Sequence, residues 1–466
     1  MNPPRPKFTA ALASVACLLL GSFAGPADAM SFAEAWDAAR QYDAQYRVAG
    51  HELASAQQLV PIARAALLPQ VALNVASSEV VGSREFPNSL NQQVRTRLEY
   101  SAPQSSLTMR LPIFNREAHS RLGQAQAQTE VAESVYRIRG LDLIDRLAST
   151  YMQVLLTEEA RQLAQAQVTA QTAQLAQLQQ RFQRGEGTKV ETAQSQATLN
   201  LLRVRVTEAD DQRELALRQL RRITGPASTP TPGLSQLPPD YRPQPLVPEG
   251  LVQWLALAVR QSPSLQAREQ SLLVARMNVQ RNRAGHYPRL DLVASASRSQ
   301  NESTSSLNQT TQLRSLGLQL NVPLFSGGGV EASVKQALAD QARVEEEIRI
   351  ERESLEVEVQ RHYLTVTTGQ SRMDAYRNLA EAAELSLQGT GRALEAGLAT
   401  GNDVADALAR VFAARRDLAQ SRIEALLART RLMIQVGTPM AEVAADVDRA
   451  LVATPNLPAS APAPRP

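Results

Sequence analysis

The segment that decides the fold runs from Asn115 to Gly185 and reads NREAHSRLGQAQAQTEVAESVYRIRGLDLIDRLASTYMQVLLTEEARQLAQAQVTAQTAQLAQLQQRFQRG. It contains no proline, and Gly123 and Gly140 are its only internal glycines. Apolar residues recur at every third or fourth position in its first half, and Ala and Gln dominate its second half, so the segment is predicted to be one α-helix. At about 1.5 Å per residue this helix would be roughly 105 Å long and would need partners of similar length.

The rest of the chain supplies such partners twice, because the sequence repeats. Pro112-Ile113-Phe114 recurs as Pro323-Leu324-Phe325, an offset of 211, and Gly185 and Thr188 recur as Gly397 and Thr400, an offset of 212. An offset that changes by one residue across a whole long helix indicates an internal repeat, which is too long and has too few copies for a solenoid.

Each half is predicted to contain the same elements in the same order. These are a helix (31–66 or 251–285), a strand (70–80 or 290–296), a polar loop (82–93 or 301–312), a returning strand (107–111 or 316–322), a long helix (115–185 or 326–396) and a last helix (188–224 or 400–437). The two shorter helices of a half together match the long one, so they are expected to stack end to end beside it as rods roughly 100 Å long.

Five regions follow from these patterns. Residues 1–29 are predicted to be a secretory signal peptide that ends in Ala27-Asp28-Ala29. Residues 30–224 form the first repeat, 225–250 a proline-rich surface linker, 251–440 the second repeat and 441–466 a disordered proline-rich tail. Lipidation at Cys17 is the alternative for the leader, and Leu18, Leu19 and Leu20 after the cysteine disfavour it.

Composition narrows the class of protein. The 49 basic and 46 acidic residues nearly cancel, so neither a strongly charged partner nor nucleic acid is expected. Cys17 is the only cysteine, and removal of the leader would leave no disulfide framework. No later apolar run is long enough for a transmembrane helix, so an exported chain of this kind is either free in the periplasm or crosses an outer membrane as strands.

The four predicted strands decide between these two locations. Four strands cannot close a barrel, and unpaired strand edges are not tolerated in lipid. The fold class is therefore expected to be an α+β membrane protein with two internal repeats. Its long antiparallel helices would form an α-helical barrel, and three chains would together complete a twelve-stranded β-barrel.

With these features the chain resembles the TolC family of outer-membrane export ducts over roughly residues 31–438. The resemblance rests on the repeat, on Leu67-Leu68-Pro69, on Leu111-Pro112-Ile113-Phe114 and Val322-Pro323-Leu324-Phe325, and on the two glycine turns. It implies a homotrimer in outer-membrane lipid that extends into the periplasm. It also implies docking to a periplasmic adaptor and to an inner-membrane ABC or proton-driven transporter, with no cofactor.

The resemblance also assigns site residues. It implies that Asp403 and Asp406 line the narrow periplasmic entrance, where three copies would form two rings of carboxylates that favour cations. The alternative is that Asp403 is the N3 acid of a helix capped by Thr400. We expect the pore role for Asp406 and both roles for Asp403.

The gate and the docking surface are expected close to these carboxylates. The resemblance implies that an arginine with an acidic partner, and in some members a tyrosine, helps to hold the entrance closed. In this chain the arginine position is Ala399 and the tyrosine position is Leu394, whereas Glu191 matches the acidic partner. Packing around Leu394 and Leu398 is therefore the hypothesis for closure. The adaptor is expected at the turn residues Gly185, Glu186, Gly187, Thr188, Gly397 and Thr400. The alternative is that the glycines serve only the turn conformation.

Other functions fit the sequence less well. The four histidines are isolated, no metal site is indicated, and Gly327-Gly328-Gly329 lacks the phosphate-loop pattern, so an enzyme is not expected. A soluble periplasmic coiled-coil adaptor would leave the strands unexplained. The favoured function is type I protein secretion or general export, and a drug or metal efflux duct of a proton-driven pump is the alternative.

Overall fold

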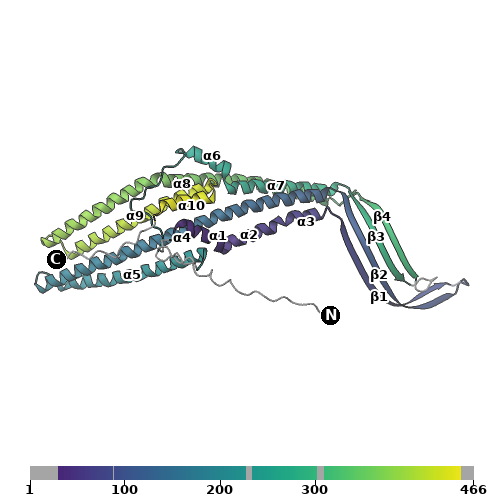
Figure 1. Cartoon of the computed structure of the whole chain (residues 1–466), viewed down its shortest axis with the longest axis horizontal. Coiled ribbons are helices and arrows are strands. Elements are labelled where there is room, and N and C mark those ends of the chain that lie inside the picture. Colours follow the sequence, from purple (N-terminus) through teal and green to yellow (C-terminus); the bar gives the residue numbers. More distant parts are fainter. Residues whose placement is uncertain (1–29, 88, 227–232, 302–308, 453–466) are drawn as a thin grey trace, which may run out of the picture.

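The computed structural model describes residues 30–87, 89–226, 233–301 and 309–452. The predicted signal peptide, with Cys17, and the tail from residue 453 onward lie outside this range. The molecule is elongated, with a layer of long helices at one end and a four-stranded sheet at the other (Figure 1). The glycine turns that connect the helices lie at the end opposite the sheet (Figure 1).

The two long helices confirm the prediction. They are α4 (Arg116–Gln183, 68 residues) and α8 (Gly329–Glu395, 67 residues). Asn115 caps α4 by accepting a hydrogen bond of 3.0 Å from the backbone N–H of Ala118. The last helix of each half is also close to its predicted bounds, at α5 (Lys189–Thr224) and α9 (Gly401–Gln435).

The predicted single helix at the start of each half is wrong. The first is divided into α1 (Phe32–Tyr42), α2 (Ala44–Gln57) and α3 (Leu59–Ala65), and the second into α6 (Leu251–Gln261), α7 (Pro263–Arg283) and the 3₁₀ turn η1 (Ala284–His286). Asp43 breaks the first because its carboxylate accepts from the N–H of Tyr46 at 2.8 Å and starts a new helix. Ser262 is non-helical (ψ 123°) because Pro263 follows it.

The strands are longer than predicted. They are β1 (Gln70–Pro87), β2 (Gln93–Asn115), β3 (Arg289–Asn301) and β4 (Gln309–Asn321), all antiparallel in the order β1-β2-β3-β4. Most of the expected loop at 82–93 is strand, because backbone pairing continues through polar positions such as Arg84 and Thr96. The described pairing of β2 with β3 starts at Gln104, so residues 93–103 of β2 pair only with residues 77–87 of β1 and form a two-stranded ribbon.

The sheet has one apolar face and one polar face. Val71 pairs with Met109, Met109 with Ala294 and Ala294 with Leu316, so these four side chains share a face. The side chains of the next row of paired residues lie on the other face: Ala72, Thr108, Ser295 and Ser315. Strands β1 and β4 are the edges of this sheet, and their apolar residues Val71, Leu73, Val75, Leu316, Leu318 and Leu320 are exposed.

Two of the region predictions need correction. The linker is not a surface spacer over residues 233–250, because Leu234, Tyr241 and Leu246 are buried and Leu234 forms a bridge with Met30. The start of the tail is helix α10 (Met440–Ala450), not disordered chain. Its apolar residues recur at three- and four-residue spacing, so it can bury Val443 and Val447 completely, whereas the prolines that suggested disorder begin at residue 455.

The core lies where these segments meet the middle of α4. Leu143, Ile144, Leu147 and Tyr151 of α4 are fully buried together with Phe32 of α1. The hydroxyl of Tyr151 donates to the carbonyl oxygens of residues 30 and 235, at 2.8 and 3.2 Å, and burial raises the pKa of this hydroxyl. The beginning of the described chain, the linker and both halves therefore meet at one level of the helix layer.

Glycines at the ends of the short helices allow the end-to-end stacking. Gly437, which follows α9, has φ +73°, and a Cβ atom built on it would lie 2.3 Å from the carbonyl oxygen of Gln261. Gly225, which follows α5, has φ +91°, and its Cβ would lie 2.9 Å from the ring of Tyr42. In both halves the last helix abuts the break in the first one, and only glycine fits there.

We predict that Gly437→Ala destabilises the protein by at least about 2 kcal/mol, because Ala adds backbone strain and a clash with a carbonyl oxygen. Thermal unfolding in detergent, followed by circular dichroism, should show a lower Tm. Gly389→Ala is the matched control, since this glycine of α8 has no neighbour within 4 Å and Ala favours a helix. Equal Tm values for the two variants would contradict the packing argument.

Candidate channel entrance at the helical tip

Two turns form the end of the molecule that lies opposite the sheet (Figure 1). In the α4–α5 turn Gly185 has φ +77°, and the N–H of Glu186 donates to the carbonyl oxygen of Arg181 at 2.9 Å. In the α8–α9 turn Gly397 has φ +75°, and the N–H of Leu398 donates to the carbonyl oxygen of residue 393 at 2.8 Å. Both are Schellman caps, so the two glycines have a conformational role, as the alternative proposed.

The helix that leaves each turn starts with a capping box. Glu191 accepts from the N–H of Thr188 at 2.9 Å, and Asp403 accepts from the N–H and the hydroxyl of Thr400 at 2.7 and 2.8 Å. These hydrogen bonds to the backbone and side chain of Thr400 lower the pKa of the Asp403 carboxyl. The structure thus shows the capping role of Asp403.

The second carboxylate of the predicted pair has a different environment. Asp406 is exposed, and its carboxylate forms no hydrogen bond or ion pair with the described residues. It lies one helical turn beyond Asp403, so the two carboxylates occupy neighbouring positions on α9. The carboxylate of Asp406 therefore faces solvent and is unpaired among the residues that the structure describes.

The two halves are joined at the tip by neutral groups that the sequence analysis missed. The side-chain amide of Gln174 in α4 donates to the carbonyl oxygen of Gly401 in α9 at 2.6 Å, and both residues are buried. A Cβ on Gly401 would lie 3.2 Å from Leu178 of α4. Asn402 also donates to the side-chain oxygen of Gln194 in α5, at 3.3 Å. No ion pair joins the two turns within the described ranges.

A signal for this contact exists in the sequence. In the alignment of the two repeats, Gly401 corresponds to Lys189, the residue that follows Thr188 in the first half. A glycine is unfavourable inside a helix unless another element approaches closely. The difference between the halves therefore marked the point where α9 packs on α4.

The predicted gate residues are not brought together within one chain. Leu394 is only 5% exposed and is packed within this chain, whereas Leu398 is 85% exposed, so packing around Leu398 would require another chain. Glu191 belongs to its own capping box and not to a bond across the halves. Among the turn residues expected to contact an adaptor, Gly185, Glu186, Thr188, Gly397 and Thr400 are exposed and Gly187 is partly buried.

No group of three or more His, Cys, Asp or Glu side chains that could hold a metal ion occurs in the described part of the chain. His362 is buried beside Glu358, and burial lowers its pKa. None of the described helices is both long enough and apolar enough to cross a membrane.

Comparison with known proteins identifies the family. The family model described as "outer membrane efflux protein" matches residues 36–226 and 254–438, which include both repeats. This chain belongs to the outer membrane efflux protein family. The proteases secretion protein PrtF of Dickeya chrysanthemi is 32% identical over 426 residues, which cover 90% of this chain and 91% of PrtF. TolC of Vibrio cholerae is 24% identical, over 93% and 96% of the two chains.

Solved structures of outer-membrane channels have a similar fold. The solved structure of the outer-membrane channel OprN matches with a TM-score of 0.74 and 18% identity, and the match covers 88% of this chain and 90% of OprN. The resemblance to TolC channels inferred from the sequence is therefore confirmed, together with the α+β class and the location in the outer membrane and periplasm. The protein is a channel-tunnel of the outer membrane.

We predict that Gln174→Met opens the tip, because the carbonyl of Gly401 would lose its buried donor at a cost of about 1–3 kcal/mol. Such a cost favours the released state at least about fivefold, so ion conductance of the purified channel in planar bilayers should rise. Gln171→Met is the matched control, since its amide bonds Ser195 within the first half. Unchanged conductance of the Gln174 variant would exclude a holding role for this amide.

The cap at Asp403 predicts a pH dependence. Because the folded pKa of its carboxyl is lowered, the cap stabilises the turn above the ordinary Asp pKa of about 3.9, and this stabilisation is lost as the pH falls through the lower folded value. Hydrogen exchange of amides 398–404, corrected for intrinsic rates, should therefore be steady from about pH 7 to 5 and rise in stronger acid. Asp403→Ala should abolish this dependence, and Asp406→Ala should leave it intact.

Proposed function

We propose that three copies of the chain form the channel. The observation that carries this proposal is the four-stranded sheet with two open edges, β1 and β4, each with a row of exposed apolar side chains. Unpaired backbone groups in lipid cost several kcal/mol each, and about eight strands are the smallest barrel. Pairing β4 of one copy with β1 of the next would give twelve strands, with the apolar face toward lipid and the polar face toward water.

We further propose that the cargo is protein exported by a type I system. The support is the similarity to the proteases secretion protein PrtF, which spans 90% of this chain. Drug or metal efflux is the second candidate. It is supported by the description of the matching family as outer membrane efflux proteins.

The tip would then have two roles in this assembly. The exposed turns 185–188 and 397–400 would contact a periplasmic adaptor, which connects the duct to an inner-membrane ABC transporter. Asp403 and Asp406 would provide the carboxylate rings of the entrance, and Leu398 would pack against a neighbouring copy. The exposure of Leu398 and the unpartnered carboxylate of Asp406 support this arrangement.

Coexpression tests the export function directly. A host that lacks its own duct but contains an ABC transporter, its adaptor and their protease substrate should release active protease into the medium only when this chain is present. Export of small toxic compounds without protease release would instead favour the efflux duct. Retention of all protease inside the cells, with the duct present in the outer membrane, would contradict the proposal.

We predict that Leu318→Arg on the apolar face abolishes the trimer seen by native mass spectrometry, because an arginine in lipid costs about 2–4 kcal/mol per chain. Gln319→Arg is the matched control, since this neighbour lies on the polar face, where its pairing partner is Asp291. Equal trimer amounts for both variants would show that the apolar face does not face lipid.

A further inference from the structure

The two halves of the chain share individual contacts as well as the order of their elements. The hydroxyl of Tyr151 in α4 donates to the carbonyl oxygen of Met30. In the second half the hydroxyl of Tyr363 in α8 donates to the carbonyl oxygen of Glu249. Residues of the long helices therefore correspond at an offset of 212, and residues of the segments before the strands correspond at an offset of 219. The breaks in the short helices have the same offset of 219.

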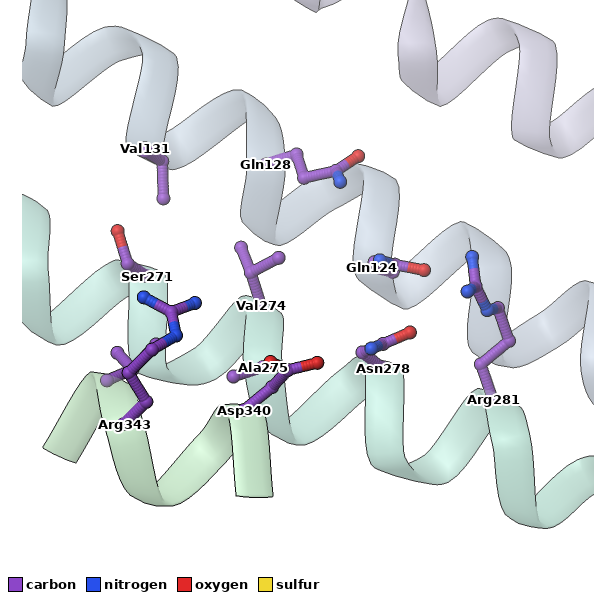
Figure 2. A pocket seen from close by; sticks show the side chains of 11 residues that line it. Gln124, Gln128, Val131, Ser271, Val274, Ala275, Asn278, Arg281, Asp340 and Arg343 are labelled. Carbon is purple, nitrogen blue, oxygen red and sulfur yellow. The ribbon is translucent and has the colours of Figure 1, made fainter. Parts of the chain in front are cut away.

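Inside one chain the two halves meet where α4 packs on α7. Figure 2 shows part of this junction, with Val131 of α4 and Val274 of α7 turned toward each other. A row of hydrogen bonds crosses it. Arg137 donates to the hydroxyl of Ser134 at 2.9 Å, and this hydroxyl donates to the Oε1 atom of Gln270 in α7 at 2.5 Å. In a closed ring of such halves, the counterpart of this junction joins α8 of one copy to α2 and α3 of the next.

The stripe of α8 that this counterpart requires is uncovered. On α4 a stripe that runs through Ser134 is buried at every seventh position: Ser120, Ala127, Ser134, Leu141 and Ala148. The corresponding residues of α8 are all exposed: Ala332, Ala339, Glu346, Glu353 and Gln360. The two long helices have nearly the same length, so the difference in burial marks a face of α8 whose cover is missing from the single chain.

The matching face of α2 and α3 is uncovered as well. Val48 is 53% exposed and Ile62 is 66% exposed. Their counterparts in α7, Ala267 and Arg281, are buried and partly buried beside α4. The sheet would bring these faces together, because β1 follows α3 and β4 precedes α8 along the chain. Pairing of β4 with β1 of the next copy therefore places α8 beside α2 and α3 of that copy.

We propose that α8 of one copy packs on α2 and α3 of the next, and that Glu346 accepts a hydrogen bond from His51 across this contact, the seam. This proposal rests on the trimer proposed above. At the offsets of 212 and 219, Glu346 is the counterpart of Ser134, and His51 is the counterpart of Gln270. The seam would thus repeat the bond that joins the halves inside one chain, with different side chains.

The α8 part of this bonded group is already assembled. Arg349 forms an ion pair with the carboxylate of Glu346 at 2.7 Å. Its counterpart in α4, Arg137, contacts Ser134 in the same way. A carboxylate can accept from more than one donor, and an imidazole carries an N–H in either protonation state. His51 is exposed and forms no hydrogen bond or ion pair within the described residues, so its ring is available to the next copy.

The charge on the α8 stripe also selects the order in which copies join. Two α8 helices facing each other would bring Glu346 and Glu353 against acids of the same kind, which is unfavourable. A contact between α8 and α2 instead joins unlike surfaces and can be repeated around a closed ring. The acidic stripe therefore favours the ring over a two-fold dimer of second halves.

Charge reversal tests the pair in the full-length chain. The His51→Glu variant should form a trimer whose lifetime on heating in detergent is about tenfold shorter, because two carboxylates would meet at each of three seams. Addition of Glu346→Lys to this variant should restore the lifetime. Glu345→Lys is the matched control, since this exposed neighbour points about 100° away from Glu346 around the helix. Equal rescue by both lysines, or rescue by neither, would overturn the proposal.

Crosslinking gives a readout that does not depend on trimer lifetime. Cysteines at positions 51 and 346, in a chain that also carries Cys17→Ser, should be joined by a short bismaleimide into covalent dimers and trimers on denaturing gels. Positions 51 and 360 are the control pair, because Gln360 lies on the same stripe about 21 Å further along α8. Equal crosslinking of both pairs would contradict the register. A native trimer without crosslinks between 51 and 346 refutes this inference alone, whereas a chain that stays monomeric in the membrane refutes the proposed trimer.

Discussion

A helix of 68 residues with apolar side chains along much of its length cannot stand alone in water. α4 obtains its support from different partners along its length: α2 and α3 toward the sheet, α1 and α10 at the middle and α5 toward the tip, with α7 and α9 on the other flank. This requirement for continuous lateral contact explains why each half has short helices stacked end to end. It also explains why glycines occur where the stacked ends meet, since a side chain there would separate the rods.

The repeat made much of this architecture predictable from the sequence. Long helices, both turns, the capping boxes at Thr188 and Thr400 and the four strands follow from local periodicity and from signals at helix ends. The breaks at Asp43 and Ser262 were missed because a long apolar pattern continues across them, and only a capping side chain or a following proline marks them. Strand ends were missed because backbone pairing extends beyond the apolar residues that reveal it.

The interior of the layer was less predictable. Linker residues 233–250 and helix α10 were assigned from their proximity to prolines, yet they contribute Leu234, Tyr241 and Val447 to the core. At the tip, the resemblance selected Asp403, Asp406 and Leu398, whereas the contact between the halves depends on Gln174 and Gly401. Such contacts join residues more than two hundred positions apart, so no local pattern in one half reports them.

The unequal strands have a consequence for the outer surface of the cell. Residues 77–87 and 93–103 pair only with each other, and the shorter β3–β4 hairpin does not accompany them. At about 3.4 Å per residue, such a ribbon can extend well clear of the lipid. In the proposed trimer, three such ribbons would surround the external mouth of the duct, where antibodies and phages could reach them. Because none of the other described strands pairs with this ribbon, its sequence is free to diversify while the wall of the conduit stays unchanged.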